Sequence, residues 1–504
     1  MKPISVLVNR IQPLMRGIQL LVVRLLAALP LAVLLLAAMP AWCDATGTQI
    51  SPTVKGLPEQ AIPAGFPLPL RTNPVQFQDG FRIDRYDVWQ KVWLDPTTGA
   101  RCGDGSPFYF YVKSRRESEN LQINLAGGGA CWDYDSCRAL HNGSELLKNV
   151  VRPSGKKNYG AIVSVLSLSN VPVITRLSIP IQSALNREGS ESFHPRSQQW
   201  NKIFVPYCTG DVHLGLKIST YTDPSGKGKP LTVSHVGAAN VLAVALWARD
   251  HLPQAKEWEL SGNSAGGVGA TALYPALRSL FPQAKSYLIN DGGPIFWAPL
   301  NANQPSAGLH RNALQVWGLA SPVASADALG TAAAQGSVLD WYATLLPEFD
   351  RSNMGSLLRA MALHWPQDRF GWLGMQEDYI FSSISYRRFL AETREPDADK
   401  RFANTMTLWQ QETSQLAQSL QDLPNVGYYL PWSRHWLAGH TILTKPDHTA
   451  AIEDAGLMPQ DFIQDVLDGT GPVMKVREHN GQHDAKQWEP MSRLIFLGAP
   501  LAGF

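Results

Sequence analysis

The chain has 504 residues, of which 44 are Lys or Arg, 42 are Asp or Glu and 44% are hydrophobic. This length and apolar content allow a large buried core and exclude a disordered chain. The formal net charge of +2 depends on the N-terminus, since Lys2, Arg10, Arg16 and Arg24 lie within its first 45 residues. The rest of the chain is close to neutral, which excludes nucleic acid as a partner.

The N-terminal segment has the pattern of a secretory signal. Residues 1–24 carry only positive charge, and the apolar run Leu25–Trp42 that follows carries no charge and is succeeded by the small residue Ala45. The run of 18 residues could also form a marginal membrane span, but Pro30 and Pro40 interrupt it as a helix. We therefore predict a secreted or periplasmic protein with no stable membrane span once the signal is removed.

Four cysteines remain after such a cleavage: Cys102, Cys131, Cys137 and Cys208. An even number of cysteines in an exported chain indicates disulfides. Cys131 and Cys137 are close enough in sequence to form a small loop, which leaves Cys102 to pair with Cys208. A zinc site of four thiolates is the alternative, but the chain lacks the CxxC spacing of such sites.

Short apolar segments alternate with longer helical ones in the body of the chain. We predict strands over 121–125, 203–207, 257–260 and 286–290, and helices over 235–252 and 266–280. Strands and helices in alternation indicate an α/β fold with a parallel sheet and helices on both faces.

The expected domain organisation follows from this alternation. A signal peptide (1–45) and an extended leader (46–80) precede a single α/β domain (81–504). Two stretches near 141–200 and 300–366 do not fit the alternation, and we predict that they are insertions forming a helical cap beside the sheet.

The clearest chemical motif is G-x-S-x-G at Gly262–Gly266, with an expected strand before it and an expected helix after it. This is the context of a nucleophile elbow. The glycines permit a strained strand-to-helix turn, and the helix N-terminus directs N–H groups towards the oxygen of Ser264. A plain glycine-rich turn is the alternative, and the polar strand Glu257–Leu260 is unusual for an elbow. We predict that Ser264 is a nucleophile.

A glycine triplet, Gly127–Gly129, follows the expected strand 121–125. Such a loop donates main-chain N–H groups to an oxyanion in many enzymes with a nucleophile elbow. A phosphate-binding loop is the alternative, but neither the Lys-Ser/Thr pair nor the G-x-G-x-x-G pattern is present. We predict that the amides of Gly128, Gly129 and Ala265 form an oxyanion hole.

Three segments in this order, LAGGGACWDYDSC, FVPYCTGDVHLG and LSGNSAGGVGA, resemble the pectin acetylesterase/Notum family of α/β-hydrolases. The resemblance is specific over residues 100–300 and diffuse afterwards. It implies an α/β-hydrolase-like, mostly parallel sheet and a secreted carboxylesterase with a Ser–Asp–His triad, without metal or cofactor. Family members deacylate substrates such as acetylated pectin or a lipid-modified protein.

The resemblance also implies a position for the triad acid, because α/β-hydrolases place it between the serine and the histidine. Asp378, in GMQEDYIF, falls where the family has its acid, and Glu377 beside it is a substitute. Asp291 follows the expected strand 286–290 directly. A structural role is favoured for Asp291, which nevertheless stays an alternative acid.

The family's histidine lies in a short segment of small residues before an apolar run. Residues 436–443 (WLAGHTIL) fit this pattern and indicate His440, with His435 as the second candidate. His479 and His483 have the spacing of zinc ligands on a helix, but the intervening Asn-Gly interrupts a helix, so we expect no metal.

The resulting prediction is a serine carboxylesterase acting on acyl esters, acetyl esters among them. A lipase or polyester depolymerase on the same fold and a catalytically silent binding protein are the alternatives. The alcohol part of the substrate, whether carbohydrate, lipid or polyester, is left open.

Overall fold

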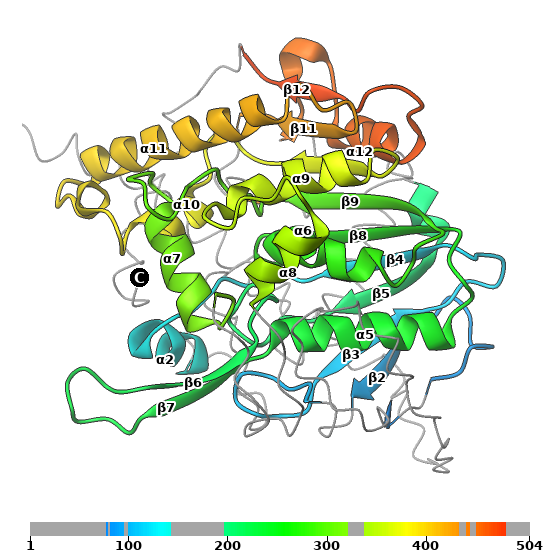
Figure 1. Cartoon of the computed structure of the whole chain (residues 1–504), viewed down its shortest axis with the longest axis horizontal. Coiled ribbons are helices and arrows are strands. Elements are labelled where there is room, and N and C mark those ends of the chain that lie inside the picture. Colours follow the sequence, from blue (N-terminus) through cyan, green and yellow to red (C-terminus); the bar gives the residue numbers. More distant parts are fainter. Residues whose placement is uncertain are drawn as a thin grey trace, which may run out of the picture. The chain divides into compact units, whose positions relative to one another are not determined.

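Figure 1 presents the computed structural model, which describes residues 77–78, 81–94, 99–142, 196–320, 337–432, 440–443 and 450–479. All of these belong to one structural unit, Thr53–Phe504. The predicted signal peptide (1–45), most of the leader (46–80) and most of the predicted insertion near 141–200 lie outside the described residues. Among the described residues, no helix has the length and apolar character needed to cross a membrane.

Ten strands of the described chain form one sheet in the order β1-β2-β3-β5-β4-β8-β9-β10-β11-β12, and β6 and β7 form a separate hairpin. Their bounds are β1 (Phe77–Gln78), β2 (Gln90–Leu94), β3 (Tyr109–Lys113), β4 (Leu121–Leu125), β5 (Asn201–Val205), β6 (Lys217–Tyr221), β7 (Leu231–His235), β8 (Glu257–Asn263), β9 (Lys285–Asp291), β10 (Arg369–Leu373), β11 (Val426–Leu430) and β12 (Lys475–Arg477).

Helices connect these strands, and several cross the near side of the sheet in Figure 1. The α-helices are α2 (Tyr134–Asn142), α5 (Gly237–His251), α6 (Ala265–Arg278), α7 (Ala307–Val316), α8 (Val338–Leu345), α9 (Leu357–His364), α10 (Tyr379–Tyr386), α11 (Ala398–Ser419) and α12 (Pro459–Asp468). Short 3₁₀ turns are η4 (Arg196–Gln199), η5 (Met354–Ser356), η6 (Ala391–Arg394) and η8 (Glu453–Ala455).

The sheet is mostly parallel, as predicted. Each neighbouring pair from β5 through β4, β8, β9, β10 and β11 to β12 is parallel. The exception is the first edge, where β1, β2 and β3 pair antiparallel with one another and β3 pairs antiparallel with β5. Among the described elements, β1, β2 and β3 precede every helix, and antiparallel neighbours need no helical crossover.

The predicted elements agree with the observed ones in type. The predictions at 121–125, 257–260 and 286–290 correspond to β4, β8 and β9, and those at 235–252 and 266–280 correspond to α5 and α6. The strand predicted at 203–207 lies two residues earlier, at 201–205.

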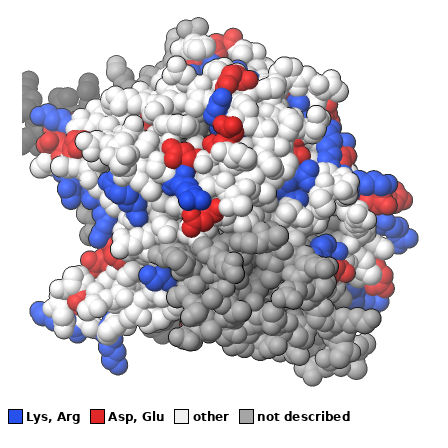
Figure 2. Space-filling view, in the orientation of Figure 1, with Lys and Arg blue, Asp and Glu red and all other residues white. Residues whose placement is uncertain are grey.

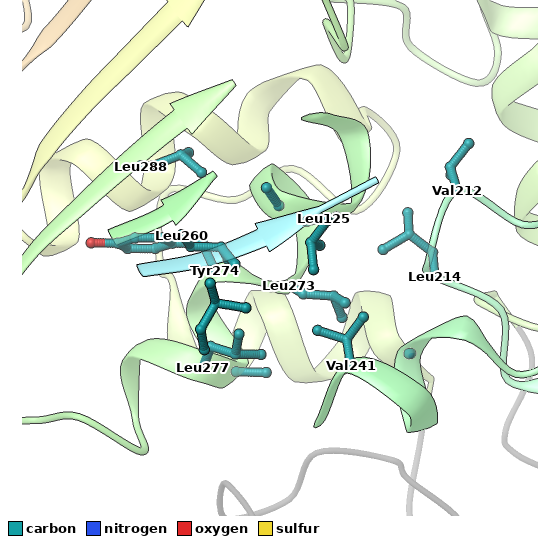
Figure 3. Packing of buried hydrophobic residues seen from close by; sticks show 14 of the residues in the cluster. Leu125, Val212, Leu214, Val241, Leu260, Leu273, Tyr274, Leu277 and Leu288 are labelled. Atoms are coloured by element: carbon teal, nitrogen blue, oxygen red, sulfur yellow. The ribbon is translucent and has the colours of Figure 1, made fainter. Parts of the chain in front are cut away.

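Helices cover both faces of the sheet, as the alternation of side chains along β9 demonstrates. Tyr287 and Ile289 pack in one buried cluster with residues of α12, such as Phe462, whereas Leu288 packs in another with Leu273 of α6. Successive side chains of a strand point to opposite faces, so α6 and α12 lie on opposite sides. Figure 3 shows the α6 side of this core, where Leu125, Leu260 and Leu288 come from adjacent strands.

The predicted cap near 300–366 is described except for residues 321–336. In it, α8 packs against α6, because the Tyr342 hydroxyl donates a hydrogen bond to the Ala272 carbonyl. α9 also contacts α6. α7 instead contacts α10 and lines a cavity described below.

Two disulfides link the described chain. Cys102 is bonded to Cys208 and Cys131 to Cys137, the same two pairs that the cysteine spacing indicated. The first disulfide joins the start of the domain to the segment after β5, and the second closes a short loop behind the glycine triplet.

Candidate active site

Ser264 lies at the turn between β8 and α6, and its backbone is in the left-handed half of conformational space, with φ 56° and ψ −122°. A residue with a β-carbon pays about 1–3 kcal/mol for such a conformation. Hydrogen bonds hold the turn: the Ser264 amide donates to the Asp291 carbonyl (2.8 Å), and the Gly267 amide donates to the Ser264 carbonyl (2.9 Å). The turn therefore has the strained geometry of a nucleophile elbow.

The glycines beside Ser264 are required by close backbone contacts. A Cβ on Gly262 would lie 2.2 Å from the carbonyl oxygen of Gly266, and a Cβ on Gly266 would lie 2.0 Å from that of Leu125. No side chain fits at these distances. The two glycines therefore allow α6 to begin directly after β8 and to pack against the end of β4.

The glycine triplet after β4 touches this elbow. A Cβ on Gly127 would lie 2.6 Å from the Asn263 carbonyl oxygen and 2.9 Å from the Ser264 Cβ. Gly128 and Gly129 have φ values of 156° and 80°. Gly129 lines the same cavity as Ser264 and Ala265, whereas Gly128 is not among the residues that line it.

His213 contacts the residue that precedes the glycine triplet. Its Nε2 lies 2.8 Å from the Ala126 carbonyl oxygen, and burial lowers the pKa of His213 to about 4. The imidazole is therefore neutral near pH 7, and Nε2–H donates this hydrogen bond. The next turn of the loop is held by the Cys131 amide, which donates to the Gly210 carbonyl (2.8 Å).

His440 and Asp378 come together although 62 residues separate them. Nδ1 of His440 lies 2.6 Å from Oδ2 of Asp378, whose side chain is fully buried. The other carboxylate oxygen, Oδ1, accepts the amides of Ile380 (3.0 Å) and Phe381 (2.8 Å) as the N-cap of α10. Because the Oδ1 hydrogen bonds fix the Asp378 side chain, its Oδ2 holds the His440 imidazole in one orientation. Nε2 of His440 is buried and has no hydrogen-bond partner in the described chain.

Asp291, the alternative acid, has a different set of contacts. Its Oδ1 accepts the Ile442 amide (2.7 Å) and its Oδ2 accepts the Leu443 amide (2.9 Å). Since its carbonyl also accepts the Ser264 amide, Asp291 connects the elbow to the segment that carries His440. Glu377 accepts a hydrogen bond from Gln410 (3.1 Å), and His435 lies outside the described residues.

An apolar cavity opens beside Ser264, with about 790 Å³ of space not filled by atoms, counting the part open to solvent. Side chains from the loop after β4, from α7 and from α10 line it, including Trp132, Leu309, Leu314, Trp317, Phe381 and Ile384. The Phe381 ring lies 6.1 Å from the His440 ring, centroid to centroid, so the cavity extends from the elbow towards the Asp378–His440 pair.

One group of possible metal ligands occurs in the described chain. Cys131, Cys137 and His235 bring their ligand atoms within 4.8 Å of one another. Both cysteines are in a disulfide, and the nitrogens of His235 are engaged by the Thr209 carbonyl and the Tyr221 hydroxyl. These residues are therefore structural. Of the two histidines with the spacing of zinc ligands, His479 and His483, the second lies outside the described residues.

The chain is similar to several known proteins. A Pectinacetylesterase family model matches residues 178–309. Palmitoleoyl-protein carboxylesterase notum2 of Xenopus laevis is 26% identical over 235 residues, which are 44% of this chain and 40% of that protein. The human palmitoleoyl-protein carboxylesterase NOTUM is 28% identical over 174 residues, 34% of this chain and 28% of that protein. The solved structure of the Wnt deacylase Notum from Drosophila has a TM-score of 0.42 and 17% identity, covering 69% of this chain and 84% of that one.

Over these matched regions the chain is similar to the pectin acetylesterase/Notum family. The matched region spans less than half the length of the relatives notum2 and human NOTUM. The family model includes Ser264 but ends before Asp378 and His440, so those two positions depend on the geometry of this chain.

Sequence reasoning missed the supporting residues of the site. His213 lies within FVPYCTGDVHLG, a segment quoted for its family resemblance without a role for any of its residues. A lone histidine carries no pattern that indicates which carbonyl it will contact. For Asp291 the sequence favoured a structural role, but it did not indicate residues 442–443 as the partners, because that contact spans 151 residues.

Proposed function

We propose that the protein is a serine carboxylesterase in which Ser264, His440 and Asp378 form the catalytic triad. The observation that carries the proposal is the 2.6 Å contact between His440 Nδ1 and a fully buried Asp378, together with a buried His440 Nε2 that has no hydrogen-bond partner among the described residues. A carboxylate on one ring nitrogen fixes the tautomer in which the other nitrogen can accept a proton.

The reaction follows from these groups. His440 Nε2 takes the proton of the Ser264 hydroxyl as Oγ attacks the ester carbonyl carbon, and Asp378 stabilises the imidazolium that forms. Collapse of the tetrahedral intermediate breaks the bond to the alcohol, which leaves with the proton from Nε2. Water then attacks the acyl-enzyme with His440 as base, and the carboxylic acid is released as Ser264 regains its proton.

The negative charge of the tetrahedral intermediate needs main-chain donors. We assign them to the amides of Gly128, Gly129 and Ala265. The proximity of the triplet to the elbow and the start of α6 at Ala265 support this assignment. Each such donor contributes roughly 3 kcal/mol to stabilisation of the transition state.

The apolar cavity favours an acyl group longer than acetyl. Its lining residues include Trp317, Leu314 and Phe381, and each buried methylene of a substrate contributes about 0.8 kcal/mol. The named relatives are palmitoleoyl-protein carboxylesterases, which supports a substrate with a long acyl chain rather than an acetyl group. Two disulfides and the signal-like N-terminus support action outside the cytosol.

Covalent labelling tests the nucleophile. A fluorophosphonate probe is expected to label the wild-type protein, and Ser264→Ala is expected to abolish labelling and turnover of 4-nitrophenyl octanoate. Ser261→Ala, which changes the other serine of the same strand–turn segment, is the control and should still be labelled. A wild-type protein that resists the probe and hydrolyses no ester would identify a silent binding protein.

Chain-length preference tests the cavity. We expect kcat/KM for 4-nitrophenyl octanoate to exceed that for the acetate at least tenfold. Equal values for the two esters would mean that the cavity does not hold the acyl chain.

A further inference from the structure

Three polar side chains besides Ser264 line the apolar cavity, and the triad uses none of them: Ser306, His310 and Ser385. The described lining contains no Lys, Arg, Asp or Glu, whereas Figure 2 shows residues of both charges spread over the visible surface. Each of the three must therefore find its hydrogen-bond partner among uncharged groups of the cavity or in the structure behind it.

Ser306, the N-cap of α7, has its partner behind the cavity. Its hydroxyl donates to Oε2 of Glu412 (2.6 Å), and its amide donates to Oε1 (2.9 Å). The hydroxyl of Tyr386, the last residue of α10, donates to the same Oε2 (2.6 Å). Glu412 thus joins the start of α7 to the end of α10 and leaves the Ser306 hydroxyl satisfied.

His310 and Ser385 differ from Ser306 in this respect. Nδ1 of His310 and Oγ of Ser385 are both buried, and neither has a hydrogen-bond partner among the residues that the structure describes. Burial, assisted by the charge of Arg311, lowers the pKa of His310 to about 4 although a hydrogen bond to the backbone of Ala298 favours the protonated ring. The imidazole is therefore neutral near pH 7. A buried polar atom without a partner costs free energy, and a neutral hydrogen-bonding ligand would remove that cost at both atoms.

These two groups lie away from the triad. α10 begins directly after Asp378, and Ser385 follows seven residues later, which is about 10 Å along the helix axis at 1.5 Å per residue. Phe381, which contacts the His440 ring, lines the cavity between them.

His310 approaches the same end of the cavity from α7. It lies one helical turn after Ser306, to whose carbonyl its amide donates (3.0 Å). It is therefore close to the junction of α7 and α10 that Glu412 holds together.

A hydroxyl group matches this pair of atoms. It both donates and accepts hydrogen bonds, so it can bond to the serine hydroxyl and to Nδ1 of a neutral imidazole in either tautomer. A charged group is disfavoured, because the lining offers it no opposite charge. An extended acyl chain of eight carbons spans roughly 9 Å with bonds of about 1.5 Å, which is comparable with the distance along α10.

We propose that His310 and Ser385 bind a hydroxyl group carried by the acyl chain of the substrate, several methylenes from the ester carbonyl. This inference rests on the proposed esterase function. It adds the substrate class, which is esters of hydroxy fatty acids, and it makes His310 and Ser385 the residues that determine this specificity.

Three esters with the same leaving group test the proposal: 4-nitrophenyl octanoate, 3-hydroxyoctanoate and 8-hydroxyoctanoate. The measured quantity is kcat/KM of each hydroxy ester divided by that of the octanoate. We expect a ratio of at least five for the 8-hydroxy ester. The 3-hydroxy ester should give a ratio below one, because its hydroxyl would lie among apolar side chains without a partner.

Ser385→Ala and His310→Phe should each bring the ratio for the 8-hydroxy ester below one, and either variant serves if the other does not fold. Ser382→Ala is the matched control, since Ser382 is a buried serine of the same helix that is not among the residues lining the cavity. It should leave the ratio unchanged. A wild-type ratio of one or less for the 8-hydroxy ester, or a ratio equal in the wild type and both cavity variants, overturns the proposal.

Binding to Ser264→Ala separates this proposal from the esterase proposal, because calorimetry with methyl octanoate and methyl 8-hydroxyoctanoate requires no turnover. Tighter binding of the hydroxy ester, lost in the Ser264→Ala/Ser385→Ala double variant, supports the hydroxyl site even if the wild type hydrolyses nothing. Equal affinity for the two esters refutes the hydroxyl site even if the wild type hydrolyses both.

Discussion

Asp378→Asn is the substitution that tests whether Asp378 or Asp291 is the acid of the triad, a choice that the sequence left open. Asparagine is as good an N-cap as aspartate, so its side-chain oxygen can still accept the amides of Ile380 and Phe381 that Asp378 Oδ1 accepts. The Nδ2 group would then face His440 Nδ1 in place of Oδ2, at a position 2.6 Å away in the wild type. Because Nδ2 is a hydrogen-bond donor, it stabilises the His440 tautomer that carries its proton on Nε2. In that tautomer Nε2 cannot accept a proton from Ser264.

The expected loss is large in rate and small in stability. An equivalent change in a well-characterised serine hydrolase lowers kcat by about 10⁴, which is a barrier increase of about 5 kcal/mol. Because the cap remains, the free energy of unfolding should change by less than about 1 kcal/mol. Steady-state hydrolysis of 4-nitrophenyl octanoate and urea unfolding measure the two quantities.

Asp291→Asn is the matched comparison. One of its two amide contacts, with Ile442 or Leu443, becomes a donor facing a donor, which costs about 1–3 kcal/mol of stability. Its kcat should fall much less than that of Asp378→Asn, because the Asp378–His440 contact is intact. If Asp291→Asn abolished turnover while Asp378→Asn retained most of it, our assignment of the acid would be refuted.

Three further predictions concern the framework of the site. Gly127→Ala places a methyl group against the elbow and should lower kcat at least about 100-fold; wild-type activity would mean that the triplet does not support the elbow. Removing the Cys102–Cys208 disulfide by alanine substitution at both positions should cost up to about 4–5 kcal/mol, seen as a lower Tm; an unchanged Tm would contradict its contribution. Burial lowers the pKa of both His213 and His235 to about 4, so their stabilising contribution is complete above pH 6.5 and is lost as the pH falls towards 4. Burial lowers the pKa of His310 to about 4 as well, whereas the buried Asp211, whose pKa burial raises to about 6, acts in the opposite sense. Three histidines against one aspartate leave a loss of about 3 kcal/mol per pH unit. Urea unfolding at pH 7, 5.5 and 4.5 measures this loss, and constant stability would refute it.

Much of the fold could be predicted because its signals are local. The apolar runs of β4 and β9, the alanine-rich α5 and the glycines around Ser264 each determine their own backbone conformation through side-chain burial or through the absence of a Cβ. The elbow was predicted for the same reason, since its strand, turn and helix are consecutive in the chain. Element boundaries were less exact: β5 begins and ends two residues earlier than expected, because hydrogen bonds to its neighbours decide where a strand stops.

The remaining site residues were predicted from a family pattern, not from their own physical chemistry. Asp378 and His440 were chosen by analogy with the order of residues in α/β-hydrolases, and Asp291 could not be dismissed. The residues adjacent to Asp378 and to His440 in the sequence do not indicate that these two side chains, 62 residues apart, are in contact. The supporting role of His213 had no sequence signal at all.

Local sequence thus determined the α/β alternation, the strained turn at Ser264 and the glycine triplet, because short-range sterics and hydrophobic periodicity act within a few residues. Only the tertiary structure decided which carboxylate orients His440 and which imidazole holds the triplet. Those outcomes depend on which segments the sheet order brings together, and burial then gives each contact its strength by removing water.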